Sequence, residues 1–151
     1  MRLIFSLMFV LTIFFTQLEM SFAAGDMTKQ EPVEIYVNLG NEKGEIKFSP
    51  NKLLLETGKL YKLILKNNSP QKHYFSSDKF SQAVFTRKVQ ISTSSGKPVA
   101  EIKGLVREIE VYPGRTAEWW FVPLKTGKFD DLRCTIPGHA EAGMVGVIEI
   151  K

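Results

Sequence analysis

The sequence predicts an all-β sandwich or barrel, and two observations carry this prediction. Short runs of alternating apolar and polar residues recur along the chain, and Gly, Pro and Asn interrupt them at regular spacing. The chain has 151 residues, of which residues 24–151 follow a predicted leader. That length suits one domain built around one hydrophobic core.

The predicted strands alternate in polarity and end at turn residues. In chain order they cover residues 33–37, 45–48, 53–55, 60–66, 108–112, 116–122, 127–134 and 144–150. Residues 38–44 and 67–71 are predicted loops. Because neighbouring residues of a strand point to opposite faces, Trp119 and Phe121 share one face and Trp120 takes the other. We expect the first face to be core and the second to be only partly covered.

Residues 76–104 break this rhythm. Ser77 and Asp78 could cap a helix, and Phe80, Val84 and Lys88 recur at four-residue spacing. Residues 92–98 resemble an exposed loop. We predict an irregular excursion from the sandwich that carries one short helix.

Residues 1–23 are predicted to be a secretory signal peptide. Arg2 forms a basic start, an apolar run covers residues 3–15, and Ser21 and Ala23 suit a cleavage site after Ala23. The alternative is an uncleaved membrane anchor, but the apolar run is short against the roughly 20 residues that a spanning helix needs, and Glu19 interrupts its extension. We therefore predict a periplasmic or secreted domain of residues 24–151, with no stable membrane insertion after cleavage.

The charge pattern excludes one class of partner. The formal net charge is +4, and single Lys and Arg residues are spread through the chain. A nucleic-acid-binding surface concentrates its basic residues on one face or along one stripe, so none is predicted here. The mild basicity indicates solubility and some preference for acidic partners.

Few residues of the chain can bind a transition metal, and they follow a definite order. Cys134 is the only cysteine, and His73 and His139 are the only histidines. A lone cysteine in an oxidising compartment can pair between chains, remain a buried thiol, or serve as a ligand. The order His73, Cys134, His139 and Met144, with four residues in each of the last two gaps, favours the ligand interpretation.

The spacing suits one metal site. Pro137 and Gly138 predict a tight turn after Cys134, and a loop between two strands can direct Cys134, His139 and Met144 at one point. An extended segment would spread them apart at about 3.3 Å per residue. One thiolate, two imidazoles and a weak axial thioether are the ligands of a blue-copper centre. Zinc is the competing metal, although structural zinc sites rarely have this donor set.

The segments around these residues resemble cupredoxins. Residues 134–139 (CTIPGH) and 142–147 (AGMVGV) are similar to the C-terminal copper loop of that family, the latter to plastocyanins and the spacing to auracyanin and rusticyanin. Residues 67–75 (NNSPQKHYF) resemble the segment of the first histidine. The resemblance implies a Greek-key β-sandwich holding one type 1 copper ion per chain. His73, Cys134, His139 and Met144 take the ligand positions.

One position departs from the family pattern. Many members have Asn or Ser after the first histidine, where the side chain hydrogen-bonds to the backbone near the cysteine. Tyr74 occupies this position here, so we expect the bracing of the two segments to differ.

The resemblance implies a monomeric carrier that shuttles single electrons between a redox donor and an acceptor. Transient docking is expected near His139, beside Pro137, Gly138, Ala140 and Ala142. The alternative is periplasmic copper storage or delivery, which the few methionines of the mature chain disfavour. An enzyme is not expected, because copper oxidases and nitrite reductases need further histidine-bound copper ions and both histidines are already assigned.

Overall fold

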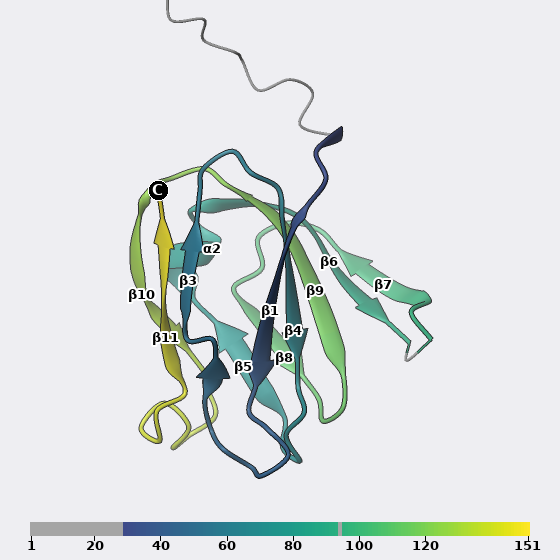
Figure 1. Cartoon of the computed structure of the whole chain (residues 1–151), viewed down its shortest axis with the longest axis vertical. Coiled ribbons are helices and arrows are strands. Elements are labelled where there is room, and N and C mark those ends of the chain that lie inside the picture. The colour runs from purple at the N-terminus through teal and green to yellow at the C-terminus, as the bar shows by residue number, and fades with distance from the viewer. Residues whose placement is uncertain (1–28, 94) are drawn as a thin grey trace, which may run out of the picture.

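The structure is a computed structural model, and it describes residues 29–93 and 95–151. The predicted signal peptide and its cleavage after Ala23 lie outside these residues. The described chain forms two β-sheets that enclose a common core (Figure 1). The predicted all-β sandwich is confirmed.

The first sheet has six strands in the order β2-β1-β4-β9-β6-β7. Its strands are β1 (Val33–Leu39), β2 (Phe48–Ser49), β4 (Tyr61–Lys66), β6 (Val84–Ser92), β7 (Pro98–Ile102) and β9 (Thr116–Pro123). β1 pairs with β4 in parallel. The pairs β4–β9, β9–β6 and β6–β7 are antiparallel. Strands far apart in the sequence therefore lie side by side.

The second sheet has five strands in the order β3-β11-β10-β5-β8. Its strands are β3 (Lys52–Leu55), β5 (His73–Ser76), β8 (Glu108–Val111), β10 (Gly127–Arg133) and β11 (Val145–Ile150). β5 lies between β10 and β8 and pairs antiparallel with both. This arrangement brings the segment that begins with His73 next to the end of β10, directly before Cys134.

The core is rich in aromatic rings that meet edge to face. Trp119 and Phe121 point inward from β9 and contact Phe80 at ring-centroid distances of 5.4 and 5.2 Å. The indole nitrogen of Trp119 donates to Thr86 Oγ1 at 3.1 Å, so its one polar group is satisfied inside the core. The predicted inward face of residues 116–122 is confirmed.

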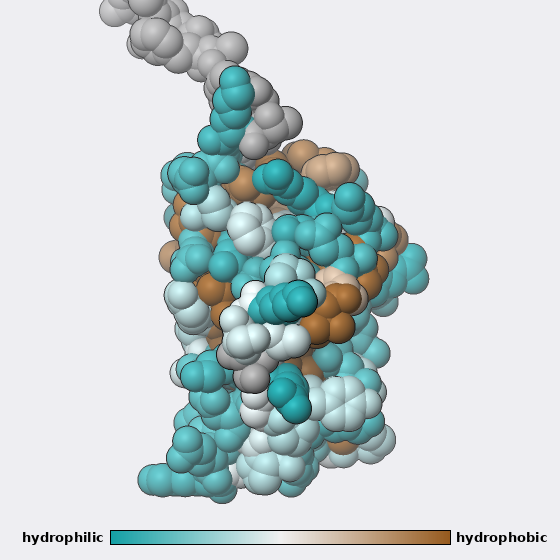
Figure 2. Space-filling view, turned by 90° about the vertical axis from the view of Figure 1, so that its right-hand side faces the viewer, coloured by the Kyte–Doolittle hydropathy of each residue, from teal (hydrophilic) through white to brown (hydrophobic). Residues whose placement is uncertain are grey.

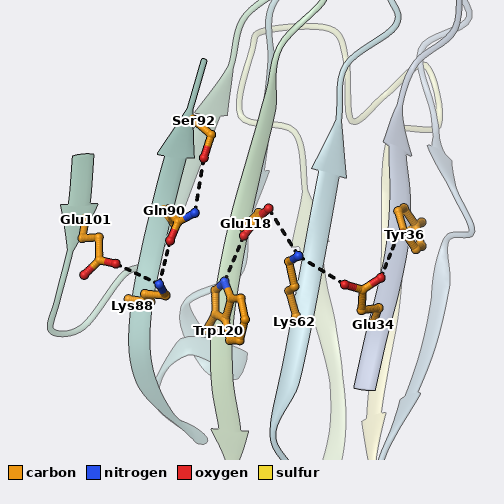
Figure 3. A network of polar contacts seen from close by, with 9 residues as sticks. All are labelled: Glu34, Tyr36, Lys62, Lys88, Gln90, Ser92, Glu101, Glu118 and Trp120. Carbon is orange, nitrogen blue, oxygen red and sulfur yellow. Dashed lines mark hydrogen bonds and ion pairs between the residues drawn. The ribbon is translucent and has the colours of Figure 1, made fainter. Parts of the chain in front are cut away.

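Trp120 lies on the opposite, outer face of the same sheet. Its ring lies near the ammonium groups of Lys62 and Lys88, 5.3 and 5.0 Å from the ring centroid. Ion pairs extend this contact across the sheet: Lys62 pairs with Glu118 and with Glu34 of β1, and Lys88 pairs with Glu101 of β7 (Figure 3). Trp120 is therefore partly covered by polar side chains, as the alternation predicted.

The prediction for residues 76–104 is correct for the short helix and for the exposed loop, which lies between β6 and β7, and it is wrong for the irregular excursion. α2 (Asp78–Ser81) is a single turn. Ser77 is the N-cap of this helix, and its Oγ accepts a hydrogen bond from the Phe80 amide. The chain then forms β6 and β7, which belong to the six-stranded sheet rather than to an excursion. A register shift between Thr86 and Lys88 changes which alternate residues face inward, and this bulge hid the two-residue period of β6.

Strand bounds elsewhere differ slightly from those predicted. β1 continues to Leu39, inside a predicted loop, and the strand predicted for residues 45–48 is only the two-residue β2. β7 is an edge strand whose residues are all exposed, and Figure 2 shows this side as a mainly polar surface with separate apolar patches. Within the described part of the chain, no helix is long and apolar enough to span a membrane.

Candidate metal centre

Three connecting segments meet at one end of the sandwich. They are the turn after β1, the segment that leads into β5, and the loop from β10 to β11. In Figure 1 this end lies at the bottom, whereas β1 begins and β11 ends at the top. The side chains of the predicted site come from the second and third of these segments.

The loop between β10 and β11 is closed by its own backbone hydrogen bonds. His139 N donates to Ile136 O at 3.0 Å, and Met144 N donates to His139 O at 2.9 Å. Cys134 N donates to Met144 O at 3.0 Å, which joins the two ends of the loop. The predicted turn therefore exists, and Gly138 takes a φ of 85° within it, a conformation that favours glycine.

The segment before β5 is fixed by a buried amide. Asn67 Nδ2 donates to Gln71 O at 2.8 Å and to Val111 O of β8 at 2.7 Å, and its Oδ1 accepts the Ser69 amide hydrogen at 2.8 Å. These bonds tie the loop to the neighbouring strand. His73 therefore starts β5 from a defined position.

The structure brings His73, Cys134 and His139 together as a buried cluster. One donor atom from each residue lies within 4.8 Å of the others. Cys134 Sγ and His139 Nδ1 are 3.4 Å apart, and the two imidazole centroids are 5.1 Å apart. His73 is 0% exposed, Cys134 1% and His139 6%.

Among the residues that the structure describes, neither ring nitrogen of His73 has a hydrogen-bond partner, although both nitrogens are buried. Buried polar groups in proteins are normally satisfied, so an unpartnered one indicates a missing ligand or a functional role. Burial, and secondarily the neighbouring His139, lowers the pKa of His73 below its usual value. A neutral imidazole at neutral pH is the form that binds a metal.

Gly40 contributes to the pocket of His73 by having no side chain. It follows β1 with a φ of 70°, and a Cβ atom built there would lie 2.9 Å from His73 Nε2 and 2.8 Å from Ser69 Cβ. Both the backbone conformation and the close approach require glycine. Sequence reasoning missed this residue because only the fold brings the end of β1 against His73.

Met144 is fully buried, and its backbone forms hydrogen bonds with two residues of the cluster. Its amide bonds to His139 and its carbonyl to Cys134, so its position depends on both residues. Ligation by its thioether remains a prediction.

The Cys134 sulfur accepts a hydrogen bond from the Tyr74 amide, with an N–S distance of 3.3 Å. The Tyr74 hydroxyl points to β8 instead, where it donates to Glu110 Oε1 at 2.9 Å. The side chain after the first histidine thus contacts a neighbouring strand. Tyr74 therefore differs from the Asn or Ser of many cupredoxins by bonding to β8 and not to the backbone near the cysteine. This bond requires Tyr74 to lie opposite Glu110, and that strand register could not be predicted from the sequence.

These residues fit a soft transition metal. A thiolate and two neutral imidazoles are the ligands of a trigonal type 1 copper site. Met144 is buried, and its backbone bonds to His139 and Cys134. Burial keeps water from the sulfur, and the Tyr74 amide is a hydrogen-bond donor of the kind that tunes the potential of such sites. The predicted His-Cys-His cluster is therefore present as a buried site at one end of a two-sheet sandwich.

Solved structures with the same fold include blue copper proteins. Auracyanin A from Chloroflexus aurantiacus is 20% identical, with a TM-score of 0.52, and the match covers 80% of this chain and 100% of that one. A dithionite-reduced auracyanin from Roseiflexus castenholzii is 15% identical, with a TM-score of 0.50, covering 80% of this chain and 99% of that one. No protein-family model and no curated protein sequence matches the chain.

The same fold also occurs as one part of larger enzymes. A multi-copper oxidase from Pediococcus acidilactici is 16% identical, with a TM-score of 0.61, and the match covers 88% of this chain but 28% of that one. At these identities the likeness establishes the cupredoxin-like fold and nothing finer. Function must be argued from the site.

Proposed function

We propose that this protein is an exported, mononuclear type 1 copper protein that carries single electrons between redox partners. His73, Cys134 and His139 would hold the copper ion, with Met144 as the weak axial ligand. The observation that carries the proposal is the buried His-Cys-His cluster, in which His73 has no hydrogen-bond partner within residues 29–93 and 95–151. Copper bound there would supply one-electron chemistry by alternating between Cu(II) and Cu(I).

The chain's own residues favour transfer of an electron over release of the metal. The loop that carries Cys134 and His139 is closed by backbone hydrogen bonds, and Asn67 fixes the approach to His73. Such preorganisation limits rearrangement when the charge of the metal changes. His139 has the largest exposed fraction of the three cluster residues, 6%, so electrons would pass through its exposed edge.

Several further statements belong to the same proposal. The domain would act in the periplasm or outside the cell after removal of residues 1–23, as a monomer. It would not be an enzyme on its own, because both histidines of the chain already lie in the cluster. Auracyanin A is described as a blue copper protein, and its fold likeness over most of this chain supports copper as the metal.

One experiment separates an electron carrier from a copper-delivery protein. The copper-loaded domain is titrated with a reductant and an oxidant while its absorbance is followed, and both oxidation states are then challenged with a copper chelator. We expect a reversible one-electron transition and slow copper loss over many cycles. Rapid transfer of Cu(I) to the chelator, with no reversible transition, would favour delivery.

A further inference from the structure

Two glutamates of β8 bind residues that are adjacent to proposed ligands. Glu108 and Glu110 are two residues apart, so their side chains project from the same face of the strand. Glu110 accepts the Tyr74 hydroxyl at 2.9 Å, and Glu108 accepts the Thr135 hydroxyl at 2.6 Å. Tyr74 directly follows His73, and Thr135 directly follows Cys134.

Glu110 also binds the residue on the other side of His73. Lys72 Nζ lies 2.8 Å from Glu110 Oε1 and 5.7 Å from the centroid of the Tyr74 ring. Lys72 and then Tyr74 hold the pKa of Glu110 below its usual range, so the carboxylate is charged at neutral pH. Both neighbours of His73 in the chain are thus attached to one carboxylate.

The strand order explains how one strand reaches both ligand segments. β8 pairs with β5 with Tyr74 opposite Glu110, and β10, which ends just before Cys134, pairs with the far side of β5. Thr135, which follows β10, and Glu108 of β8 lie on opposite sides of β5, and their hydrogen bond crosses this strand. Glu108 and Thr135 are exposed, Tyr74 and Glu110 are half-buried, and His73 and Cys134 are buried, so these contacts lie on the outer face of the sheet.

The consequence for the sulfur is direct. Tyr74 N donates to Cys134 Sγ at 3.3 Å, so the position of the Tyr74 backbone sets this hydrogen bond. A bond from the Tyr74 hydroxyl to β8 limits movement of that backbone. Groups outside the ligand set that orient the ligands are a general feature of metal sites.

We propose that Glu108 and Glu110 are positioning residues that hold His73 and Cys134 in place from the outer face of the five-stranded sheet. They act through Thr135, Tyr74 and Lys72 and touch no metal themselves. The inference rests on the proposed copper site for its functional meaning. The contacts themselves belong to the protein chain and can be tested without metal.

The first test measures the reactivity of the Cys134 thiol in the metal-free protein. Thr135→Val and Tyr74→Phe each remove one hydroxyl and keep the shape of the side chain, and Thr135→Ser restores the hydroxyl. The matched control is Tyr36→Phe, which breaks an equivalent bond of 2.8 Å to Glu34 on the other sheet. Reaction with an aromatic disulfide reagent reports how often the buried thiol becomes accessible.

We expect thiol labelling to be faster by about two- to tenfold for each hydrogen bond lost, the range that one net hydrogen bond supports. Thr135→Ser and Tyr36→Phe should label at the rate of the unmodified chain. Thermal unfolding followed by circular dichroism establishes that each variant is folded. Thr135 is exposed, so Thr135→Val keeps the test open if Tyr74→Phe does not fold.

The second test uses the copper-loaded protein. Tyr74→Phe and Thr135→Val should shift the reduction potential and the thiolate-to-copper absorption maximum, and should release copper to a chelator several-fold faster than Tyr36→Phe. Thiol labelling, potential and release all equal to those of Tyr36→Phe would overturn the positioning role. A featureless copper spectrum of the unmodified chain would instead overturn the proposed function, and thiol labelling would still decide the role of the two glutamates.

Discussion

At the scale of single residues, the site depends on a residue that has no side chain. Gly40 lies against His73 with a positive φ, and any side chain there would meet His73 Nε2 and Ser69. Gly44 offers a matched comparison. Its φ is 77°, but apart from its chain neighbours no described residue has an atom within 4 Å of a Cβ built there. Substituting Gly44 therefore tests backbone strain alone, whereas substituting Gly40 tests backbone strain together with crowding of His73.

We expect Gly40→Ala to weaken copper binding and Gly44→Ala to leave it unchanged. Both substitutions should lower the free energy of unfolding by about 1–2 kcal/mol, because alanine resists positive φ. Only Gly40→Ala also displaces His73. Urea unfolding of the metal-free proteins and copper-release rates check this. Equal release rates for the two variants would show that Gly40 does not shape the site.

Met144 allows a similar separation of packing from ligation. Met144→Leu keeps an apolar side chain of similar volume, so the free energy of unfolding of the metal-free protein should fall by less than about 1.5 kcal/mol. If the thioether is the axial ligand, its loss should change the reduction potential and the visible spectrum, because the axial ligand tunes both. An unchanged potential and spectrum in cyclic voltammetry and absorption would make Met144 a core residue only.

At the scale of elements, the sequence predicted strands best where one face is buried and the register is regular. The alternation in residues 116–122 placed Trp119, Trp120 and Phe121 on their observed faces. The sequence did not predict β6, for two reasons. The bulge near Thr86 interrupts the alternation of the strand, and the spacing of Phe80 and Val84 suggests a longer helix than the single turn α2. Local pattern does not reveal a bulge, since it depends on the partner strand.

The residues of the candidate site likewise fall into those that the sequence predicted and those that it did not. The clustering of His73, Cys134 and His139 could be predicted, because donor chemistry and loop spacing are visible in the sequence. The contributions of Gly40, Glu108 and Glu110 could not, because each depends on which strands become neighbours. In the sequence, Glu108 and Glu110 are ordinary polar positions of an alternating strand. Their role depends on β5 pairing with β8 and on β10 pairing with the other side of β5.

At the scale of the whole molecule, the cluster lies at the end of the sandwich opposite the start of β1 and the end of β11 (Figure 1). His139 is the most exposed residue of the cluster, at 6%, and Pro137 and Ala142 of the same loop are exposed. A partner that approaches this end would come close to the proposed copper site. Electron carriers use small interfaces that separate quickly, commonly below about 1,200 Å².

We expect Ala142→Glu to slow electron transfer with a physiological partner, because it places a larger, charged side chain beside His139. The copper absorption band should be unchanged, because Ala142 is not a proposed ligand. Stopped-flow kinetics at two ionic strengths measures the effect, with Ala100→Glu on β7 as an exposed control. Transfer rates equal to those of the control would contradict docking at this surface.

The visible spectrum of the oxidised, copper-loaded domain tests most directly whether Cys134 is the thiolate ligand of one copper ion. An intense thiolate-to-copper(II) charge-transfer band is expected at one copper per chain, and Cys134→Ser should abolish it. A copper-loaded domain with no such band, or a band that persists in Cys134→Ser, would contradict this role of Cys134.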